Sequence, residues 1–252
     1  FQCGDTEIEV VDLPGTYSLT AHSDEELVAR DEILDGEVDL VVDVVDASNL
    51  ERNLYLATQF MELGVPLILA FNMSDVAEAR GYAIDTDHLS ALLKVTIVNT
   101  VGHKEKGVEA LREAIVHVAE NPRAHEPTEV HYGAQLEREL AAITPLVAAE
   151  PGVTRRLPAR WAAVKLLEGD ERVREAVRER ASDPEPIFAQ VERSSQHLTG
   201  DLRDAPEVLV ADHRYGFISG ACQECVRLTV ESRHDMSDRI DAVLTNKYLG
   251  LP

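Results

Sequence analysis

The segment Asp12–Thr16 combines the residue types that a magnesium-phosphate site requires. It follows Ile8–Val11, an apolar and β-branched run that predicts a strand buried in a parallel sheet. Pro14 and Gly15 then end that strand in a loop. An aspartate at the carboxyl end of a strand can help to hold Mg²⁺, directly or through water, and a glycine N–H can bind a terminal phosphate. Because Asp-x-x-Gly is also an ordinary turn sequence, the motif needs a second one to support it.

Asn72 and Asp75 provide that second motif, since they follow another apolar segment, 64–71. The Asp75 carboxylate can accept hydrogen bonds from guanine N1–H and the exocyclic amine, and the Asn72 amide can donate to N7. Adenine presents an acceptor at N1 and would leave the carboxylate unpaired, which costs about 5 kcal/mol or more of discrimination. The alternative is a turn rich in Asn and Asp. The order of the two motifs on separate predicted strands favours a guanine nucleotide site.

Composition limits the classes of partner and domain. The 252 residues are enough for one large domain or two ordinary ones. With 46 acidic and 24 basic residues the net charge is −22, which speaks against a nucleic-acid partner. The three cysteines form no disulfide framework, and this fits a reducing compartment. No apolar run is long enough to span a membrane and there is no signal peptide. Because the chain begins at Phe1 in mid-pattern, we expect it to be cut from a longer protein.

Strands and helices alternate in the first half of the sequence. Apolar runs predict strands at 39–46, 64–71 and 95–98 besides the one at 8–11, and helical patterns predict helices at 23–34, 49–64, 85–93 and 107–120. Such alternation predicts an α/β fold with a doubly wound, mostly parallel sheet that binds ligands at the carboxyl ends of its strands.

The second half follows a different pattern. Asn121-Pro122 to Pro127 breaks the alternation and predicts a linker. Beyond it no segment predicts a strand, and helical patterns run over 130–149, 159–168, 171–181, 186–198, 205–230 and 236–248. We therefore expect an all-α domain, with the single tryptophan, Trp161, packed in its core.

Several longer motifs resemble the cytoplasmic N-terminal GTPase region of bacterial ferrous iron transport protein B, FeoB. The resemblance extends over essentially the whole chain, and its motifs lie at 12–19, 43–54, 72–75, 165–170, 214–215 and 244–252. It implies a Ras-like G domain at residues 1–121, a linker at 122–129 and a helical domain at 130–252 that leads into a polytopic membrane domain. Pro252 would then lie shortly before the first membrane span.

The resemblance also implies a function. The chain would be a GTP-binding, slowly GTP-hydrolysing regulatory domain of an Fe(II) transporter at the cytoplasmic face of the inner membrane. Its ligands would be GTP or GDP with Mg²⁺, held by Asp12 through water, and K⁺ is a further candidate ion. Its own membrane domain and a homo-oligomer are the candidate protein partners. The implied nucleotide-binding residues are Asp12, Leu13, Pro14, Gly15, Asn72, Met73, Asp75, Asn99, Thr100 and Val101, and Thr16 is a weak catalytic candidate.

Two departures from the usual GTPase pattern affect catalysis. The chain has no Gly-x-x-x-x-Gly-Lys-[Ser/Thr] motif, which in this family precedes the segment that begins at Phe1, and activity should require it. Thr16 stands where many small GTPases place a glutamine that positions water, so we expect slow intrinsic hydrolysis.

The sequence also allows other interpretations. Cys222 and Cys225, with His213 and His234 nearby, would suit a metal, although two cysteines three apart on a helix are commonly core residues. The cluster at 22–26 can be an iron site or simply the polar start of a helix. Rival functions are a nucleotide-silent scaffold and a GTPase of ribosome assembly, and the absence of a basic patch disfavours the latter.

Overall fold

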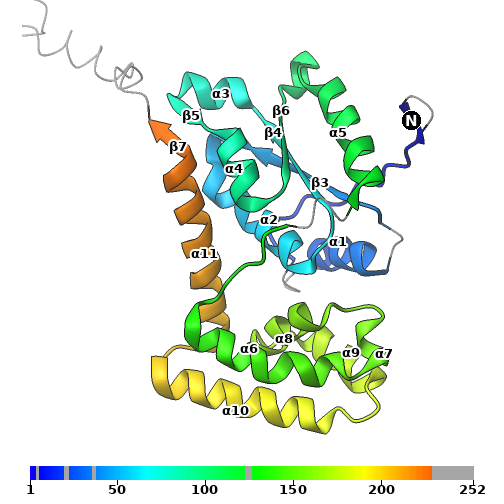
Figure 1. Cartoon of the computed structure of the whole chain (residues 1–252), viewed down its shortest axis with the longest axis vertical. Coiled ribbons are helices and arrows are strands. Elements are labelled where there is room, and N and C mark those ends of the chain that lie inside the picture. Colours follow the sequence, from blue (N-terminus) through cyan, green and yellow to red (C-terminus); the bar gives the residue numbers. More distant parts are fainter. Residues whose placement is uncertain (4–5, 20–22, 36–37, 123–126, 229–252) are drawn as a thin grey trace, which may run out of the picture.

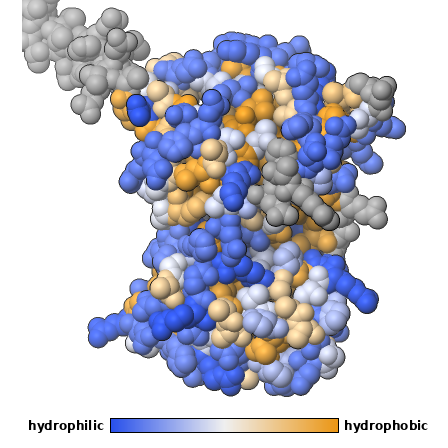
Figure 2. Space-filling view, viewed as in Figure 1, coloured by the Kyte–Doolittle hydropathy of each residue, from blue (hydrophilic) through white to orange (hydrophobic). Residues whose placement is uncertain are grey.

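The computed structural model describes residues 1–3, 6–19, 23–35, 38–122 and 127–228. Figure 1 shows two halves, a sheet with helices around it and a group of helices alone, with helix α11 running along both. Most of the surface visible in Figure 2 is polar, as the net charge of −22 leads one to expect. None of the helices in the described part of the chain combines the length and apolar composition that a membrane crossing needs.

Three parallel strands form the central sheet of the first half. The strands β3 (Val41–Asp46), β4 (Leu67–Asn72) and β6 (Thr96–Asn99) lie in the order β3-β4-β6. The predicted alternation is therefore present. Strand β4 is central and its residues 67–71 are buried, because it has a strand on each side and helices pack against the sheet. Those helices include α2 (Leu50–Leu63) and α5 (Val108–Glu120).

The predicted strand at Ile8–Val11 is wrong. The chain begins with a small hairpin of β1 (Gln2–Cys3) and β2 (Thr6–Glu7), and among the described residues no strand follows Glu7 before β3. Val10 and Val11 are 66% and 56% exposed. A β-branched composition favours extended backbone, but a strand also needs a neighbour to pair with, and this segment joins neither edge of the parallel sheet.

Helix α1 (Asp24–Asp35) follows this segment and begins with a reciprocal cap. The backbone N–H of Glu26 donates to Ser23 Oγ at 3.2 Å, and the N–H of Ser23 donates to Glu26 Oε2 at 3.2 Å. The cluster at 22–26 thus contains a helix start, and His22 lies outside the described residues.

Short elements connect the strands of the sheet. They are η1 (Ala47–Asn49), α3 (Ser74–Ala79), β5 (Tyr82–Ile84), α4 (Thr86–Leu93) and η2 (Gly102–Lys104). Strand β5 pairs in antiparallel fashion with β7 (Val226–Leu228). The expectation of no strand in the second half is therefore wrong, and the helix predicted at 205–230 ends at Cys225. The sequence of β7 continues the apolar pattern of the helix. These residues form a strand because they pair with β5, which is far away in sequence.

Six helices make up the second half as the structure describes it. They are α6 (Gly133–Ala148), α7 (Pro151–Thr154), α8 (Ala159–Leu167), α9 (Glu171–Arg180), α10 (Glu185–Leu202) and α11 (Pro206–Cys225). All but the single turn α7 were predicted. Trp161 is 1% exposed in their core, as expected. The helix predicted at 236–248 lies outside the described residues, as do 123–126 of the linker, and the boundaries 1–121, 122–129 and 130–252 stay a prediction.

A buried ion cluster joins the two halves. Arg214 of α11 is fully buried and binds Glu62 of α2 through two hydrogen bonds of 2.6 and 2.8 Å. The same guanidinium binds Glu168 at the end of α8, and Lys165 Nζ lies 2.9 Å from that carboxylate. Each charge is thus balanced by an opposite one. A buried cluster of this kind fixes α2 against α8 and α11, because separating its members would leave charges without partners.

Candidate functional site

The sheet places the second predicted motif beside the loop that follows β6. In the register of the strands Asp46 pairs with Asn72, and Phe71 pairs with Asn99. The loops after β3, β4 and β6 therefore leave the sheet at one edge, which is where parallel sheets bind ligands. Of the predicted residues, Asn72 and Asn99 are the last residues of β4 and β6, and Met73, Asp75, Thr100 and Val101 lie just beyond these strand ends.

Hydrogen bonds hold the loops after β4 and β6 together. Asn72 Oδ1 accepts from the backbone N–H of Gly102 at 3.0 Å, which leaves the Asn72 amide nitrogen as a donor. The Ser74 hydroxyl donates to the Thr100 carbonyl at 3.1 Å. The N–H groups of Thr100 and Val101 donate to the carbonyls of Phe71 and Lys106, respectively. Thr100 and Val101 therefore use their N–H groups to shape the loop.

A glycine lets the second loop close on itself. Gly107 has a φ of +81°, and a Cβ atom there would lie 2.2 Å from the Asn99 carbonyl oxygen. Only glycine fits this position without moving the strand end, since a side chain would meet backbone at that distance. Met73 adopts a left-handed conformation (φ 57°) with a side chain that is 47% exposed. The motif thus turns sharply, with Asn72 and Asp75 on either side of Met73.

Asp75 has two differently placed oxygens. Oδ2 lies 2.5 Å from Lys104 Nζ, and this hydrogen bond, together with the positive charge, lowers the pKa of the Asp75 carboxyl group. Oδ1 is buried and has no hydrogen-bond partner among the described residues. The carboxylate is therefore ionised at neutral pH, and one of its oxygens lacks a side-chain partner in the described part of the chain.

No motif of the sequence singled out Lys104 as the partner of Asp75. The Lys104 side chain is 57% exposed. The strand order did contain a signal for this pair. Residues that follow two adjacent parallel strands leave the sheet at the same edge, so a basic residue after β6 comes close to an acidic residue after β4.

The Asp12–Thr16 segment lies in a different setting. Asp12, Pro14 and Gly15 are exposed, and Leu13 packs against the core. The Thr16 hydroxyl donates to the Ser18 carbonyl at 2.6 Å and accepts from the Ser18 N–H at 3.3 Å. The structure therefore describes Thr16 in a local turn, and this segment belongs to none of the sheets.

Just beyond that turn the chain is anchored to α2. The Leu19 N–H donates to Gln59 Oε1, and Leu19 is fully buried. The guanidinium of Arg52 lies 4.3 Å from the centre of the Tyr17 ring. The segment that leads into α1 is thus fixed to α2 at its carboxyl end.

Comparison with family models and solved structures identifies the family of the chain. It matches the family model described as ferrous iron transport protein B over residues 1–115 and that of the FeoB cytosolic helical domain over residues 132–227. The crystal structure of mGMPPNP-bound NFeoB from S. thermophilus is 34% identical, with a TM-score of 0.74 over 86% of this chain and 79% of that one. The chain belongs to the FeoB family.

Further relatives agree with this assignment. The cytosolic domain of L. pneumophila FeoB is 29% identical, with a TM-score of 0.74 over 90% of this chain and 83% of that one. The Fe(2+) transport protein A/Fe(2+) transporter FeoB fusion protein of Porphyromonas gingivalis is 40% identical over all of this chain. The Fe(2+) transporter FeoB of Escherichia coli K12 is 36% identical, also over all of it. The chain spans 30% and 31% of the length of these two relatives.

The cysteine pair of this FeoB-family chain lies inside α11. Cys222 and Cys225 are 5% and 1% exposed, and burial raises the pKa of the Cys222 thiol to about 12. Within the described ranges, no three His, Cys, Asp or Glu side chains gather as metal ligands would. His213 lies against Gly133, and His234 falls outside the described residues. The thiols occupy the position of small core residues.

Proposed function

We propose that the chain is the GTP-binding regulatory part of a bacterial ferrous iron transporter and discriminates guanine through Asp75. The observation that carries this proposal is the free, buried Oδ1 of an ionised carboxylate at the edge where the loops meet. Guanine offers N1–H and a 2-amino group to such an acceptor, whereas adenine offers a lone pair at N1. The nucleotide named in the S. thermophilus structure is a guanine nucleotide analogue, in line with this choice.

The other residues take roles that follow from their positions. Asn72 donates to guanine N7 through its amide nitrogen, since its oxygen is already bonded to Gly102. Met73 covers one side of the base, and the loop at 99–101 closes the other. Leu13, Pro14 and Gly15 border the phosphates, towards which the Gly15 N–H donates.

Mg²⁺ bound with the nucleotide would neutralise phosphate charge, and Asp12 would hold it through water. Asp12 is an exposed carboxylate that belongs to no group of three or more candidate metal ligands in the described part of the chain. This fits an ion held mainly by phosphate oxygens and water. K⁺ is a further proposed ion, to which no residue of this chain is assigned.

Hydrolysis requires more than these residues supply. We propose that GTP turnover needs a Gly-x-x-x-x-Gly-Lys-[Ser/Thr] loop in front of this segment, because the sequence contains no such phosphate-binding motif. Thr16 is the weak catalytic candidate, and its turn with Ser18 keeps the hydroxyl engaged. Because the Thr16 hydroxyl is engaged in this turn, we expect it to position the attacking water poorly and GTP hydrolysis to be slow.

The transporter role is proposed from the relatives. They are named Fe(2+) transporters, so Fe²⁺ would be the cargo of the whole protein, carried by a membrane domain. This chain would then act at the cytoplasmic face of the inner membrane, with that membrane domain and further copies of itself as partners.

Displacement of a fluorescent GDP analogue tests the base assignment. The protein would be the present chain preceded by the phosphate-binding loop, titrated with GDP, ADP and xanthosine diphosphate. We expect GDP to compete at least about a thousandfold better than ADP, because ADP leaves the buried acceptor unpaired. Equal competition would refute the guanine assignment, and no binding of any nucleotide would favour a nucleotide-silent scaffold.

A further inference from the structure

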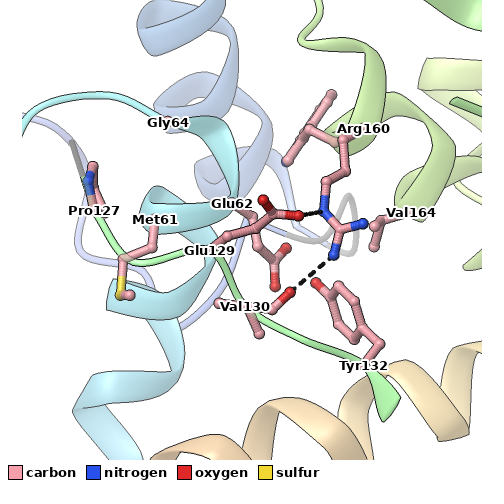
Figure 3. Close-up of a pocket in the computed structure, with 10 residues that line it drawn as sticks. Met61, Glu62, Gly64, Pro127, Glu129, Val130, Tyr132, Arg160 and Val164 are labelled. Carbon is pink, nitrogen blue, oxygen red and sulfur yellow. Dashed lines mark hydrogen bonds and ion pairs between the residues drawn. The ribbon is translucent and has the colours of Figure 1, made fainter. Parts of the chain in front are cut away.

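A pocket of about 280 Å³ lies between the two halves, away from the loops of the candidate nucleotide site. Its walls come from the end of α2, from the segment that leads into α6 and from α8 (Figure 3). Met61, Val130 and Val164 give it apolar surface. Its volume is near the lower end of the range for small-molecule sites, about 300–1,000 Å³.

Two residues that line the pocket carry a buried donor without a hydrogen-bond partner in the described part of the chain. The Tyr132 hydroxyl and Trp161 Nε1 belong to residues that are each 1% exposed, and neither atom has a hydrogen-bond partner among the described residues. Figure 3 shows the Tyr132 hydroxyl directed into the pocket beside Glu62. The Glu62 carboxylate accepts two hydrogen bonds from Arg214, and its contact with the Tyr132 hydroxyl does not have the geometry of a hydrogen bond. A buried donor without an acceptor costs about 1–3 kcal/mol, which an acceptor inside the pocket would recover.

The protonation state of these donors is fixed. Burial, reinforced by the charge of Glu62, raises the pKa of Tyr132 far above its ordinary value. The hydroxyl therefore keeps its proton, and an indole N–H can only donate. Both groups call for acceptor atoms in whatever fills the pocket.

The charged groups around the pocket are already paired. Arg160 Nε lies 2.5 Å from Glu129 Oε1, and Arg160 also donates to Glu137 at 2.8 Å and to the Val130 carbonyl at 3.0 Å. Two carboxylates thus face one guanidinium at the mouth, and Arg214 compensates Glu62. This arrangement offers no free cation to an anionic ligand and repels one.

We propose that this pocket binds a small, uncharged molecule with a flat apolar body and one or two acceptor atoms, such as a carboxamide oxygen or a ring nitrogen. The acceptors meet Tyr132 and Trp161, and the apolar body packs against Met61, Val130 and Val164. Because the occupant touches α2, α8 and the segment between the halves, it holds the halves in the arrangement seen here. The proposal does not depend on the nucleotide assignment.

Trp161 makes the test direct, because it is the only tryptophan in the chain. The probe is nicotinamide, a neutral ring with two acceptors, and nicotinate is the anionic counterpart with the same ring. We expect saturable quenching of Trp161 fluorescence by nicotinamide with an unchanged excited-state lifetime, as binding before excitation requires. Nicotinate should give collisional quenching alone.

Tyr132→Phe removes one donor and keeps the ring. Its nicotinamide affinity should fall about tenfold, the equivalent of one hydrogen bond, while its melting temperature should not drop, since no bonded group is lost. Tyr215→Phe, at a tyrosine that is 54% exposed, is the matched control and should bind as the parent does. Non-saturable quenching, equal binding of nicotinate, or equal affinity of both variants would each overturn the proposal and leave water as the only occupant.

Discussion

Asp43 in the sheet and Glu168 at the junction of the halves are equally buried and titrate in opposite directions. Asp43 is 9% exposed and the Glu168 side chain 11%. Burial raises the pKa of Asp43 to about 7, and one of its oxygens has no partner among the described residues. Burial also pushes the pKa of Glu168 upward, but Lys165 and Arg214 outweigh it and the pKa ends below its ordinary value. Whether a buried carboxylate is charged therefore depends on its cationic partners more than on how deeply it is buried.

Asp75 is a third case between these two. One oxygen meets an exposed lysine and the other is buried without a partner. The hydrogen bond from Lys104 keeps the group ionised, while the other oxygen is left for the base contact proposed above. The three carboxylates therefore differ: Glu168 is structural, Asp75 is the proposed ligand of the base, and Asp43 carries a cost in stability.

Removing the shared cation should have the largest effect on stability. Arg214→Met leaves Glu62 and Glu168 buried with Lys165, the partner of Glu168, as the remaining cation of the cluster, so we expect a loss of about 3–5 kcal/mol in the free energy of unfolding. Urea denaturation at pH 7 measures it. Arg112→Met, at an exposed pair 3.4 Å from Glu109, is the control and should change the stability by less than about 0.5 kcal/mol. A loss below about 1 kcal/mol at Arg214 would show that the cluster is hydrated.

The unpaired carboxylate should make stability depend on pH. Because the pKa of Asp43 is about 7 in the folded chain and 3.8 ordinarily, the folded state binds the extra proton between these values. Stability contributed by Asp43 therefore falls as pH rises through that window. Asp43→Asn should then be more stable than the parent at pH 8, by about 2–4 kcal/mol, and gain much less at pH 5.

Urea denaturation at the two pH values measures this difference. Asp39→Asn, at an exposed position just before the same strand, is the control. A gain that is the same at pH 5 and pH 8 would show that Asp43 has an ordinary pKa.

Asp75→Asn tests the acceptor at the candidate nucleotide site. Xanthine carries an oxygen where guanine has its 2-amino group, so the carboxylate should repel it and an amide should bind it. In the chain preceded by the phosphate-binding loop, we expect the variant to lose GTP affinity and gain affinity for xanthosine triphosphate, a swing of about 3 kcal/mol. Competition among GTP, ATP and xanthosine triphosphate measures it. An unchanged preference for GTP would mean that residues 72–75 form an ordinary turn.

The exposed partner of Asp75 should matter least for stability. Lys104→Met removes the same kind of pair as Arg214→Met, but its members are 57% and 32% exposed. Solvent already screens such a pair, so the free energy of unfolding should change by less than about 1 kcal/mol. The two methionine variants, measured side by side in urea, isolate the effect of burial. A similar loss of unfolding free energy in both variants would contradict the conclusion that burial makes the Arg214 cluster more important for stability than the exposed Lys104–Asp75 pair.

Local patterns were sufficient for most of the fold. The apolar runs located β3, β4 and β6, and the helical patterns located most of the helices of both halves. Asn72 and Asp75 could be placed near the loop at 99–102, because adjacent parallel strands end at the same edge. Periodicity and strand-end geometry are properties of short segments, so sequence alone contains them.

Tertiary structure decided what depends on distant partners. Val10 and Val11 have the composition of a strand and still lie exposed, while residues 226–228 continue a helical pattern and still form a strand beside β5. Arg214 meets Glu62 across 152 residues. Hydrogen bonding between strands and the pairing of buried charges are set by whichever groups the fold brings together, and no local pattern records them. The sequence determined which segments could form the candidate site, and the packing of those segments determined which oxygen of Asp75 is paired with Lys104 and which lacks a partner among the described residues.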